Sequence, residues 1–355
     1  MGIQDEFRMP AEFEKHRGCW ILFPERHDNW RQSAVPAQQA FANVATTVSR
    51  FEKVTVGALP TQLARVRRLL PEHIRVVSIE YDDAWIRDTG RTCVINSQGV
   101  VRGIKWEFNS WGGLFASWNK DNLVAQKVLE IEKLDRYESS MVLEGGAVHV
   151  DGEGTLIATM ECVLNSNRNA NMDKHKAETI FKEYFNTEKV IWLPRGIYLD
   201  ETGGHIDNLC CFVRPGVVVL AWTNDQTDPQ WEISADAYNI LSKETDAKGR
   251  RLEIHKLHQP QPMFITKEES EGFEAGHGTI SRKTGDRLPA SYVNFYIANG
   301  VVVMPSFNDP MDIQAVNTLQ SLFPDRKVVA VSAREILLGG GAVHCIVQQI
   351  PLPRK

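Results

Sequence analysis

A glycine-rich pentapeptide occurs twice in this chain, and that repetition restricts the possible folds more than any other feature. Gly-Gly-Ala-Val-His stands at residues 145–149 and again at residues 340–344. A third segment, Gly-Gly-His-Ile-Asp at residues 203–207, begins in the same way. Each segment leads into an apolar run that predicts a strand. Repeated strand openings are typical of closed or stacked repeat architectures rather than of independent domains.

The spacing of these segments gives the size of the repeated unit. Asp88, Gly146 and Gly204 mark positions 58 residues apart, and the interval from Gly204 to Gly341 is 137 residues, about two units. A predicted hairpin at residues 291–304 occupies the open position. The chain therefore divides into five units of hairpin and helix, which predicts an α/β fold. Radial closure of such units would bring their strand openings to one centre.

Local patterns place strands and helices inside these units. The sequence Asn299-Gly300 suits a type I′ hairpin turn, Asn119 or Asp121 is expected to cap a helix, and residues 82–90 read as a polar turn. Strands are predicted at 19–23, 53–59, 74–79, 92–96, 155–159, 190–193, 209–213, 217–222, 291–297, 301–304 and 327–331. Helices are predicted from 36 to 48 and at 61–70, 121–134, 173–185, 231–246 and 311–323, with the face of the third formed by Leu123, Val124, Val128, Ile131 and Leu134.

Composition excludes several classes of function. The net charge is −5 and no block of basic residues is present, which argues against a nucleic-acid surface. The six cysteines include no C-x-x-C pair, so neither a zinc ribbon nor a thioredoxin-type site is indicated. The N-terminus lacks the apolar core of a signal peptide, and no apolar run is long enough to span a bilayer. We therefore expect a cytoplasmic protein with reduced thiols and no membrane partner.

Side chains with catalytic chemistry stand at the repeated strand openings. They are Asp88, Glu144, His205, Asp207 and Cys345. His205 and Asp207 are two residues apart on a predicted strand, so both face the same side. If the openings meet at one centre, three carboxylates, one imidazole and one thiol come together there.

Each of these residues also has a structural interpretation when it is considered alone. Cys345 would be a small buried apolar residue, and His205 a hydrogen-bonded core histidine. Glu144 would be a solvated turn residue, and Asp88 would pair with its neighbour Arg87. These alternatives remain open for each residue singly, and only the shared position of the residues in the repeat favours a common site.

Several buried carboxylates require a compensating cation. The spacing matches no zinc or EF-hand pattern, so no metal is expected. An organic guanidinium is planar, permanently charged, and matches carboxylates through paired N–H groups. A thiolate facing its central carbon could add to it, and a histidine could carry the proton to the departing nitrogen.

Ten motifs follow one another along the chain: MPAEFE, GCWILFPER, DNWR, PAQQAF, DDAWIRDTG, WEFNSWGG, LEGGAVHVDGEGT, ETGGHID, CFVRPG and GGGAVHCIVQQ. In these motifs the chain resembles the agmatine deiminase family, within the guanidine-modifying superfamily that includes arginine and peptidylarginine deiminases. The resemblance covers essentially the whole length. It implies one α/β domain over residues 1–355, a five-bladed α/β propeller (pentein) with pseudo-fivefold repeats around a central active site.

The resemblance implies a role for each residue of the centre. Cys345 resembles the nucleophile and His205 the general acid and base, while Glu144 would bind a guanidinium nitrogen and assist proton transfer. Asp88 and Asp207 would clamp the guanidinium. The implied reaction converts agmatine to N-carbamoylputrescine and ammonia through a covalent amidino-thioether, without a cofactor or metal.

The remaining substrate contacts are expectations of the same kind. Trp85 and Trp111 would line the alkyl chain, and Glu201 would meet the distal amine because it lies close to His205 in the sequence. The partner is thus a small cationic guanidino compound, and family members are compatible with a homodimer or a higher homo-oligomer.

The chain departs from the family pattern at three positions. Ala342 stands where the family usually has asparagine, Gly203 where it often has asparagine or aspartate, and Val347 where it usually has threonine. These departures keep two alternatives open, a deiminase of another guanidino compound such as arginine and a weakly active paralogue that binds guanidines.

Overall fold

Most strands lie in five mixed sheets of one design. In this computed structural model, which describes residues 7–274 and 280–353, the strands form four sheets of three strands, one of four strands and one pair. β4 (Thr92–Ile95) and β5 (Val101–Glu107) form an antiparallel hairpin, α5 (Val124–Glu132) crosses over, and β6 (Arg136–Val142) returns parallel to β5. A parallel return needs a long connection, which a helix supplies.

Three further sheets repeat this order of hairpin, helix and parallel strand. They are β7 (Val148–Val150), β8 (Thr155–Thr159), α7 (Lys174–Phe185) and β9 (Lys189–Leu193); β10 (Cys210–Arg214), β11 (Val217–Trp222), α8 (Pro229–Leu241) and β12 (Glu253–His258); and β15 (Tyr296–Ala298), β16 (Val301–Ser306), α10 (Met311–Leu322) and β17 (Lys327–Ser332).

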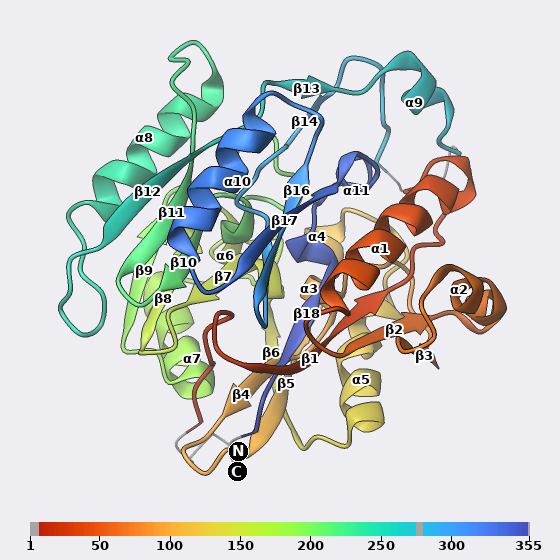
Figure 1. Cartoon of the computed structure of the whole chain (residues 1–355). Coiled ribbons are helices and arrows are strands. Elements are labelled where there is room, and N and C mark those ends of the chain that lie inside the picture. Colours follow the sequence, from red (N-terminus) through yellow and green to blue (C-terminus); the bar gives the residue numbers. More distant parts are fainter. Residues whose placement is uncertain (1–6, 275–279, 354–355) are drawn as a thin grey trace.

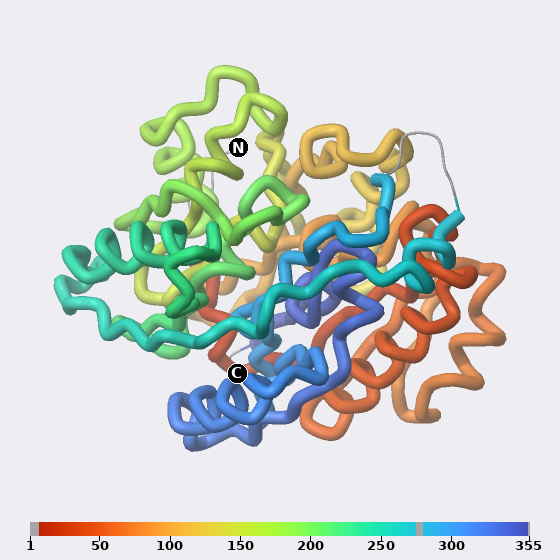
Figure 2. The backbone as a smooth tube through the Cα atoms, turned by 90° about the horizontal axis from the view of Figure 1, so that it is seen from above, coloured from red at the N-terminus to blue at the C-terminus, as the bar shows by residue number. Residues whose placement is uncertain are grey.

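The fifth sheet joins the two ends of the chain. β18 (Gln348–Pro351) pairs antiparallel with β1 (His16–Leu22), and after α1 (Val35–Val48) the chain returns as β2 (Val54–Ala58), parallel to β1. The C-terminal strand thus completes the unit that the N-terminal strand begins, and the blue and red segments lie together in Figure 1 and Figure 2. A fourth strand, β3 (Arg75–Ser78), follows α2 (Leu63–Leu69).

Helices lie outside the sheets. In Figure 1, α2, α5, α7 and α8 occupy the periphery, whereas the short α3 (Ile86–Thr89) and α4 (Ser110–Gly113) lie nearer the middle. β11 is buried at every position, as expected for a strand with partners on both edges and both faces covered. The smaller elements are η1 (Gln32–Ala34), η2 (Pro60–Gln62), η3 (Asp121–Leu123), α6 (Met160–Val163), β13 (Met263–Phe264), α9 (Lys267–Glu271), β14 (Arg287–Leu288) and α11 (Arg334–Leu338).

The predicted α/β class is confirmed, and most predicted strands and helices lie where the patterns indicated. Two predictions near α5 are wrong. Neither Asn119 nor Asp121 caps the helix. Asp121 instead accepts hydrogen bonds from the backbone N–H groups of Asp82 and Asp83. Leu123 is 44% exposed and lies outside the apolar face.

Three further predictions are corrected. Residues 82–90 include one helical turn, α3, and the helix predicted at 231–246 ends at Leu241. The hairpin at Asn299-Gly300 forms, but only Gly300 has a positive φ, so its turn is not type I′. Asn299 instead exchanges hydrogen bonds with the backbone of His16 through its side chain. No helix in the described ranges is long and apolar enough to cross a membrane.

Candidate active site

Short turns at the strand openings carry all five predicted catalytic side chains. Asp88 lies in α3 before β4, and Glu144 directly precedes η4 (Gly145–Ala147), which leads into β7. His205 and Asp207 belong to η5 (Ile206–Asn208) and its N-cap, before β10. Cys345 lies in η6 (His344–Ile346), before β18. His205 and Asp207 are therefore not on a strand as predicted, yet both are buried in the same site.

Gly146 lies where three of these side chains come closest. A Cβ atom added there would stand 2.6 Å from His205 Nδ1, 2.9 Å from Asp207 Oδ2 and 3.0 Å from Asp88 Oδ1. Only glycine leaves room at this point. The Gly146 backbone N–H donates to Asp88 Oδ1 at 3.0 Å, which fixes that carboxylate. The repeated glycine therefore allows these side chains to approach one another.

His205 lies between two carboxylates at distances longer than a hydrogen bond. Its Nδ1 is 3.8 Å from Asp88 Oδ2, and its Nε2 is 3.9 Å from Glu144 Oε2. Both ring nitrogens are buried and lack a hydrogen-bond partner among the described residues. Burial opposes a charge on this imidazole, but the Asp88 carboxylate raises the pKa of His205 well above its ordinary value. This shift favours the imidazolium form of the ring, which can give up a proton.

Two of the carboxylates have different pKa values. Burial, with the nearby Asp207 and Glu144 carboxylates, raises the pKa of Asp88 to about 6. Burial acts on Glu144 in the same direction, but the Arg168 guanidinium outweighs it and lowers the pKa of Glu144 to about 2. Arg168 Nε donates to Glu144 Oε1 at 2.8 Å, which leaves Oε2 facing His205.

Cys345 is almost fully buried, with 4% of its surface exposed. Its Sγ accepts a hydrogen bond from Asn294 Nδ2 at 3.3 Å and lies 3.8 Å from Asp207 Oδ2. Burial and the carboxylates of Asp207 and Asp88 raise the pKa of the Cys345 thiol well above its ordinary value, against smaller opposing effects of the Ala342 backbone and Asn294. Without a bound cation these effects favour the neutral thiol over the thiolate.

A small cavity reaches the sulfur and is walled by aromatic side chains. Trp85 stacks on Trp30 at 5.1 Å between ring centroids, which fixes one wall. Trp111 has a positive φ of 52°, and its indole donates to Asp88 Oδ2 at 2.9 Å. Backbone strain of this kind at a tryptophan is typical of a functional site. The residues that line the cavity are Trp85, Asp88, Trp111, Leu114, Phe115, Glu201, Thr202, Gly339, Gly340, Gly341 and Cys345.

Glu201 lines the same cavity, with 22% of its side chain exposed. Its carboxylate is held by both terminal nitrogens of Arg282, a buried arginine that also donates to the Gly339 carbonyl at 3.0 Å. Burial lowers the pKa of Arg282 to about 10, so it remains charged at neutral pH. No sequence pattern pointed to this arginine.

The sequence analysis also did not identify Arg168 or Asn294 as site residues. Asn294 donates to Asn208 Oδ1 at 2.9 Å as well as to the sulfur, and it precedes β15 as the other site residues precede their strands. Its place at the start of the hairpin predicted at residues 291–304 was therefore a usable signal. Arg168 lies in a loop with no repeat pattern. Arg87 binds Glu12 at 3.0 Å, so the proposed pairing with Asp88 does not explain Asp88.

Among the residues that the structure describes, two groups of potential metal ligands have donor atoms within 4.8 Å of one another. Glu144, Cys162 and His205 belong to the site itself. Glu12, His149 and His344 form the second group, which contacts the site where His344 Nδ1 lies 2.8 Å from Asp207 Oδ2. In both groups a carboxylate already faces an arginine, which supplies positive charge without a metal.

Comparisons with known proteins agree with this geometry. The sequence profile described as Porphyromonas-type peptidyl-arginine deiminase matches residues 8–351. The chain is 52% identical to the agmatine deiminase of Pseudomonas aeruginosa (strain LESB58), across 99% of this chain and 97% of that protein. This chain belongs to the agmatine deiminase family.

Other family members support the assignment. A Listeria monocytogenes (serotype 4b) protein, whose name assigns it provisionally to the agmatine deiminases, is 58% identical over 98% of this chain and 97% of its own length. The solved structure of Enterococcus faecalis agmatine deiminase superposes with a TM-score of 0.96 at 45% identity, covering 98% of this chain and 97% of that one. The predicted family and enzyme class, a hydrolase among the guanidine-modifying enzymes, are confirmed.

Proposed function

We propose that this family member hydrolyses agmatine to N-carbamoylputrescine and ammonia. The supporting observation is the convergence of one thiol, one imidazolium and three carboxylates at the end of a cavity with tryptophan walls. Buried carboxylates that lack a full set of countercharges favour a cationic ligand. The Oδ1 atom of Asp207 is buried without a hydrogen-bond partner among the described residues, so it remains available to a guanidinium N–H.

In the first half of the reaction, the bound guanidinium favours ionisation of the Cys345 thiol, whose proton passes to solvent, and the thiolate then attacks the guanidinium carbon. His205 enters this step as an imidazolium and gives its proton to the departing ammonia. The product is an amidino-thioether on Cys345. Asp88, Asp207 and Glu144 hold the guanidinium nitrogens while the carbon becomes tetrahedral.

In the second half, His205 is neutral and removes a proton from the attacking water. Collapse of the tetrahedral intermediate breaks the C–S bond, releases the ureido product as its hydroxyl proton passes to solvent, and regenerates the thiolate. Glu144 Oε2 faces His205 Nε2 and supports the charge that the ring regains. No cofactor or metal takes part in this scheme.

The distal end of the cavity favours an amine over a carboxylate. Glu201 would accept hydrogen bonds from the substrate ammonium, with Arg282 holding the carboxylate in place. Arginine would bring a second carboxylate close to Glu201. The guanidinium of Arg282 already binds Glu201 and is not available to a substrate carboxylate. We therefore favour agmatine over arginine as the substrate.

The decisive experiment compares the purified wild type with Cys345→Ala and a Cys345→Ser variant in a carbamoyl assay with agmatine and arginine. We expect turnover of agmatine by the wild type and a loss of at least about 1000-fold in both variants, since nucleophilic catalysis requires the thiolate. Folded wild-type protein that converts neither compound would rule out the enzyme and leave the guanidine-binding alternative. Near-normal turnover by Cys345→Ala would exclude Cys345 as nucleophile.

We also propose that the five units close as a five-bladed propeller in one domain over residues 1–355, supported by the shared strand order and the β18–β1 pairing. A cytoplasmic location is supported by the described cysteines, all of which are free thiols.

A further inference from the structure

The residue before the nucleophile, His344, connects two buried carboxylates. Its Nδ1 is 2.8 Å from Asp207 Oδ2, and its Nε2 is 2.7 Å from Glu12 Oε2. A neutral imidazole has a single N–H and can donate to only one of them, whereas an imidazolium donates to both. The side chain is 4% exposed, so solvent does not compete for these contacts.

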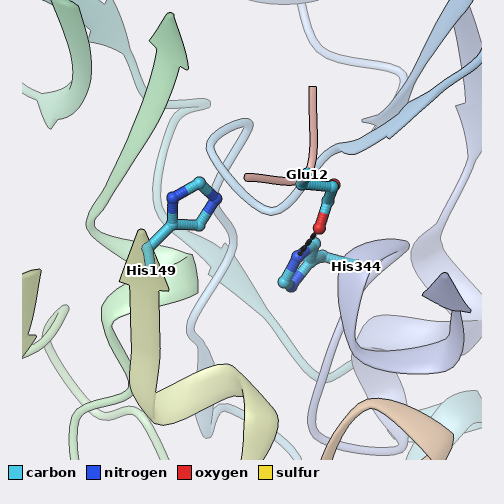
Figure 3. A group of neighbouring side chains, drawn as sticks. All are labelled: Glu12, His149 and His344. Carbon is cyan, nitrogen blue, oxygen red and sulfur yellow. Dashed lines mark hydrogen bonds and ion pairs between the residues drawn. The ribbon is translucent and has the colours of Figure 1, made fainter. Parts of the chain in front are cut away.

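Glu12 is held as a carboxylate by donors on other elements. Arg87 Nη2 donates to its Oε2 at 3.0 Å, and the backbone N–H of Ile297 donates to its Oε1 at 2.8 Å. Each of these donors favours the ionised form. Because Glu12 is ionised, it cannot supply the proton between itself and His344, so that proton belongs to the ring. Figure 3 shows the carboxylate of Glu12 directed at His344.

His149 provides an internal comparison, because it ends the other copy of Gly-Gly-Ala-Val-His. Its ring lies 6.4 Å from that of His344 between centroids, and it stands apart from the Glu12–His344 pair in Figure 3. The Nδ1 of His149 accepts a hydrogen bond from the Phe212 backbone at 3.3 Å, so this nitrogen carries no proton. The same pentapeptide thus holds a neutral ring in one copy and a charged ring in the other.

We propose that His344, anchored by Glu12, is a positioning residue that keeps Asp207 ionised and correctly oriented for the guanidinium. This inference rests on the proposed function and extends it to a group that does not touch the substrate. Asp207 uses Oδ2 for His344, and its Oδ1 is buried without a hydrogen-bond partner among the described residues. Fixing one oxygen leaves the other free for the substrate.

The charges around His344 agree with this assignment. Burial and the neighbouring Arg87 oppose a charge on the ring, but the carboxylates of Glu12 and Asp207 raise the pKa of His344 above its ordinary value. In return His344 lowers the pKa of Asp207 despite burial. Burial, with His344 and Arg87 nearby, lowers the pKa of His149 to about 4, so that ring stays neutral.

The test compares His344→Asn with the matched variant His149→Asn. Asparagine keeps a polar group near the position of Nδ1 but carries no charge and does not reach Glu12. For His344→Asn we expect KM for agmatine to rise by about 10- to 100-fold, the range for losing a hydrogen bond between charged groups. We expect kcat to fall less than KM rises. His149→Asn keeps an acceptor for the Phe212 N–H and is expected to leave both constants within about 2-fold of the wild type.

The pH profile separates positioning from a general structural role. Without His344, protonation of Asp207 joins that of Asp88, so the acid limb of kcat/KM moves to higher pH and becomes steeper. An active wild type with an unchanged KM and acid limb in folded His344→Asn would overturn the inference. If that variant does not fold, Glu12→Gln removes the same anchoring charge and is expected to move the acid limb in the same direction.

Nitrogen-15 NMR of histidine-labelled protein provides a readout that does not depend on turnover. At pH 7.5 we expect His344 to give signals of a doubly protonated ring and His149 those of a neutral ring. If the wild type converts no guanidino compound but His344 is doubly protonated, the proposed function fails and the charged His344 bridge stands. A neutral His344 overturns the inference whether or not the protein is active.

Discussion

At the residue scale, the site is a balance of buried charges that a substrate completes. His205 lies near the carboxylates of Asp88 and Glu144, and Arg168 pairs with Glu144. Burial and the carboxylates of Asp207 and Asp88 favour the neutral thiol of Cys345. A guanidinium both satisfies the carboxylates and eases formation of the thiolate. The order of these residues in the repeats was readable from the sequence. Arg168 was not, because only the folded chain brings its loop to Glu144.

The pKa of Asp88, raised to about 6, predicts the acid limit of activity. Below this pH the carboxyl is protonated and no longer attracts the guanidinium, so kcat/KM should fall about tenfold for each pH unit below 6. A profile measured between pH 4.5 and 8 with agmatine checks this prediction. Constant kcat/KM down to pH 5 would contradict it.

Glu201 should determine preference for a substrate with a distal amine. In Glu201→Gln we expect KM for agmatine to rise about tenfold, because a charge-assisted hydrogen bond contributes about 1.5–3 kcal/mol. Butylguanidine lacks the amine and serves as the control, with the same KM in both proteins. An unchanged KM for agmatine would show that Glu201 does not bind the distal amine.

At the scale of single elements, the turns before the inner strands decide where the chemistry lies. The sequence indicated their positions through the repeated glycines, but the strand predicted at 291–297 forms only over Tyr296–Ala298. It did not indicate that Asp207 lies in a 3-10 turn, with His205 at its N-cap, rather than in a strand. Periodicity cannot distinguish a strand from a short turn over three residues, because the choice depends on what packs around the backbone.

The turn at Gly146 gives the third prediction. Gly146→Ala should lower kcat/KM at least 100-fold, because the new methyl group would meet His205 Nδ1 at 2.6 Å, well inside contact distance. Gly249→Ala is the control, at an exposed turn with a φ of +80° and nothing within 4 Å of the added atom. It should cost about 1–2 kcal/mol in stability through its left-handed backbone and retain full activity. Equal activity in the two variants would contradict this account of the glycine.

At the scale of the whole molecule, β18 pairs with β1 and brings Cys345, near the C-terminus, beside groups from the first two thirds of the chain. The site contains side chains from several units, so a ligand that binds it also holds those units together. Ligands that bind only the native state stabilise it by mass action.

Agmatine should therefore raise the melting temperature of Cys345→Ala, which binds without turnover. At 100 times Kd a ligand contributes about 2.7 kcal/mol, so we expect a rise of several degrees. Putrescine has the amines but no guanidinium, and should shift the melting temperature by less than about 1 °C at the same concentration. Equal shifts for both compounds, measured by calorimetry, would show that the carboxylates do not recognise the guanidinium.

The sequence by itself determined the repeat and the α/β class, because glycine-rich openings and hydrophobic periodicity are local properties of a chain. Its ordered motifs indicated the family, and it predicted Asp88, Glu144, His205, Asp207 and Cys345 as site residues. Only the tertiary structure decided which charges face one another. The contacts of Glu144 with Arg168, Glu201 with Arg282, and His344 with Glu12 join residues 24, 81 and 332 positions apart. No local pattern encodes such distances, and protonation in the site depends on them and on burial.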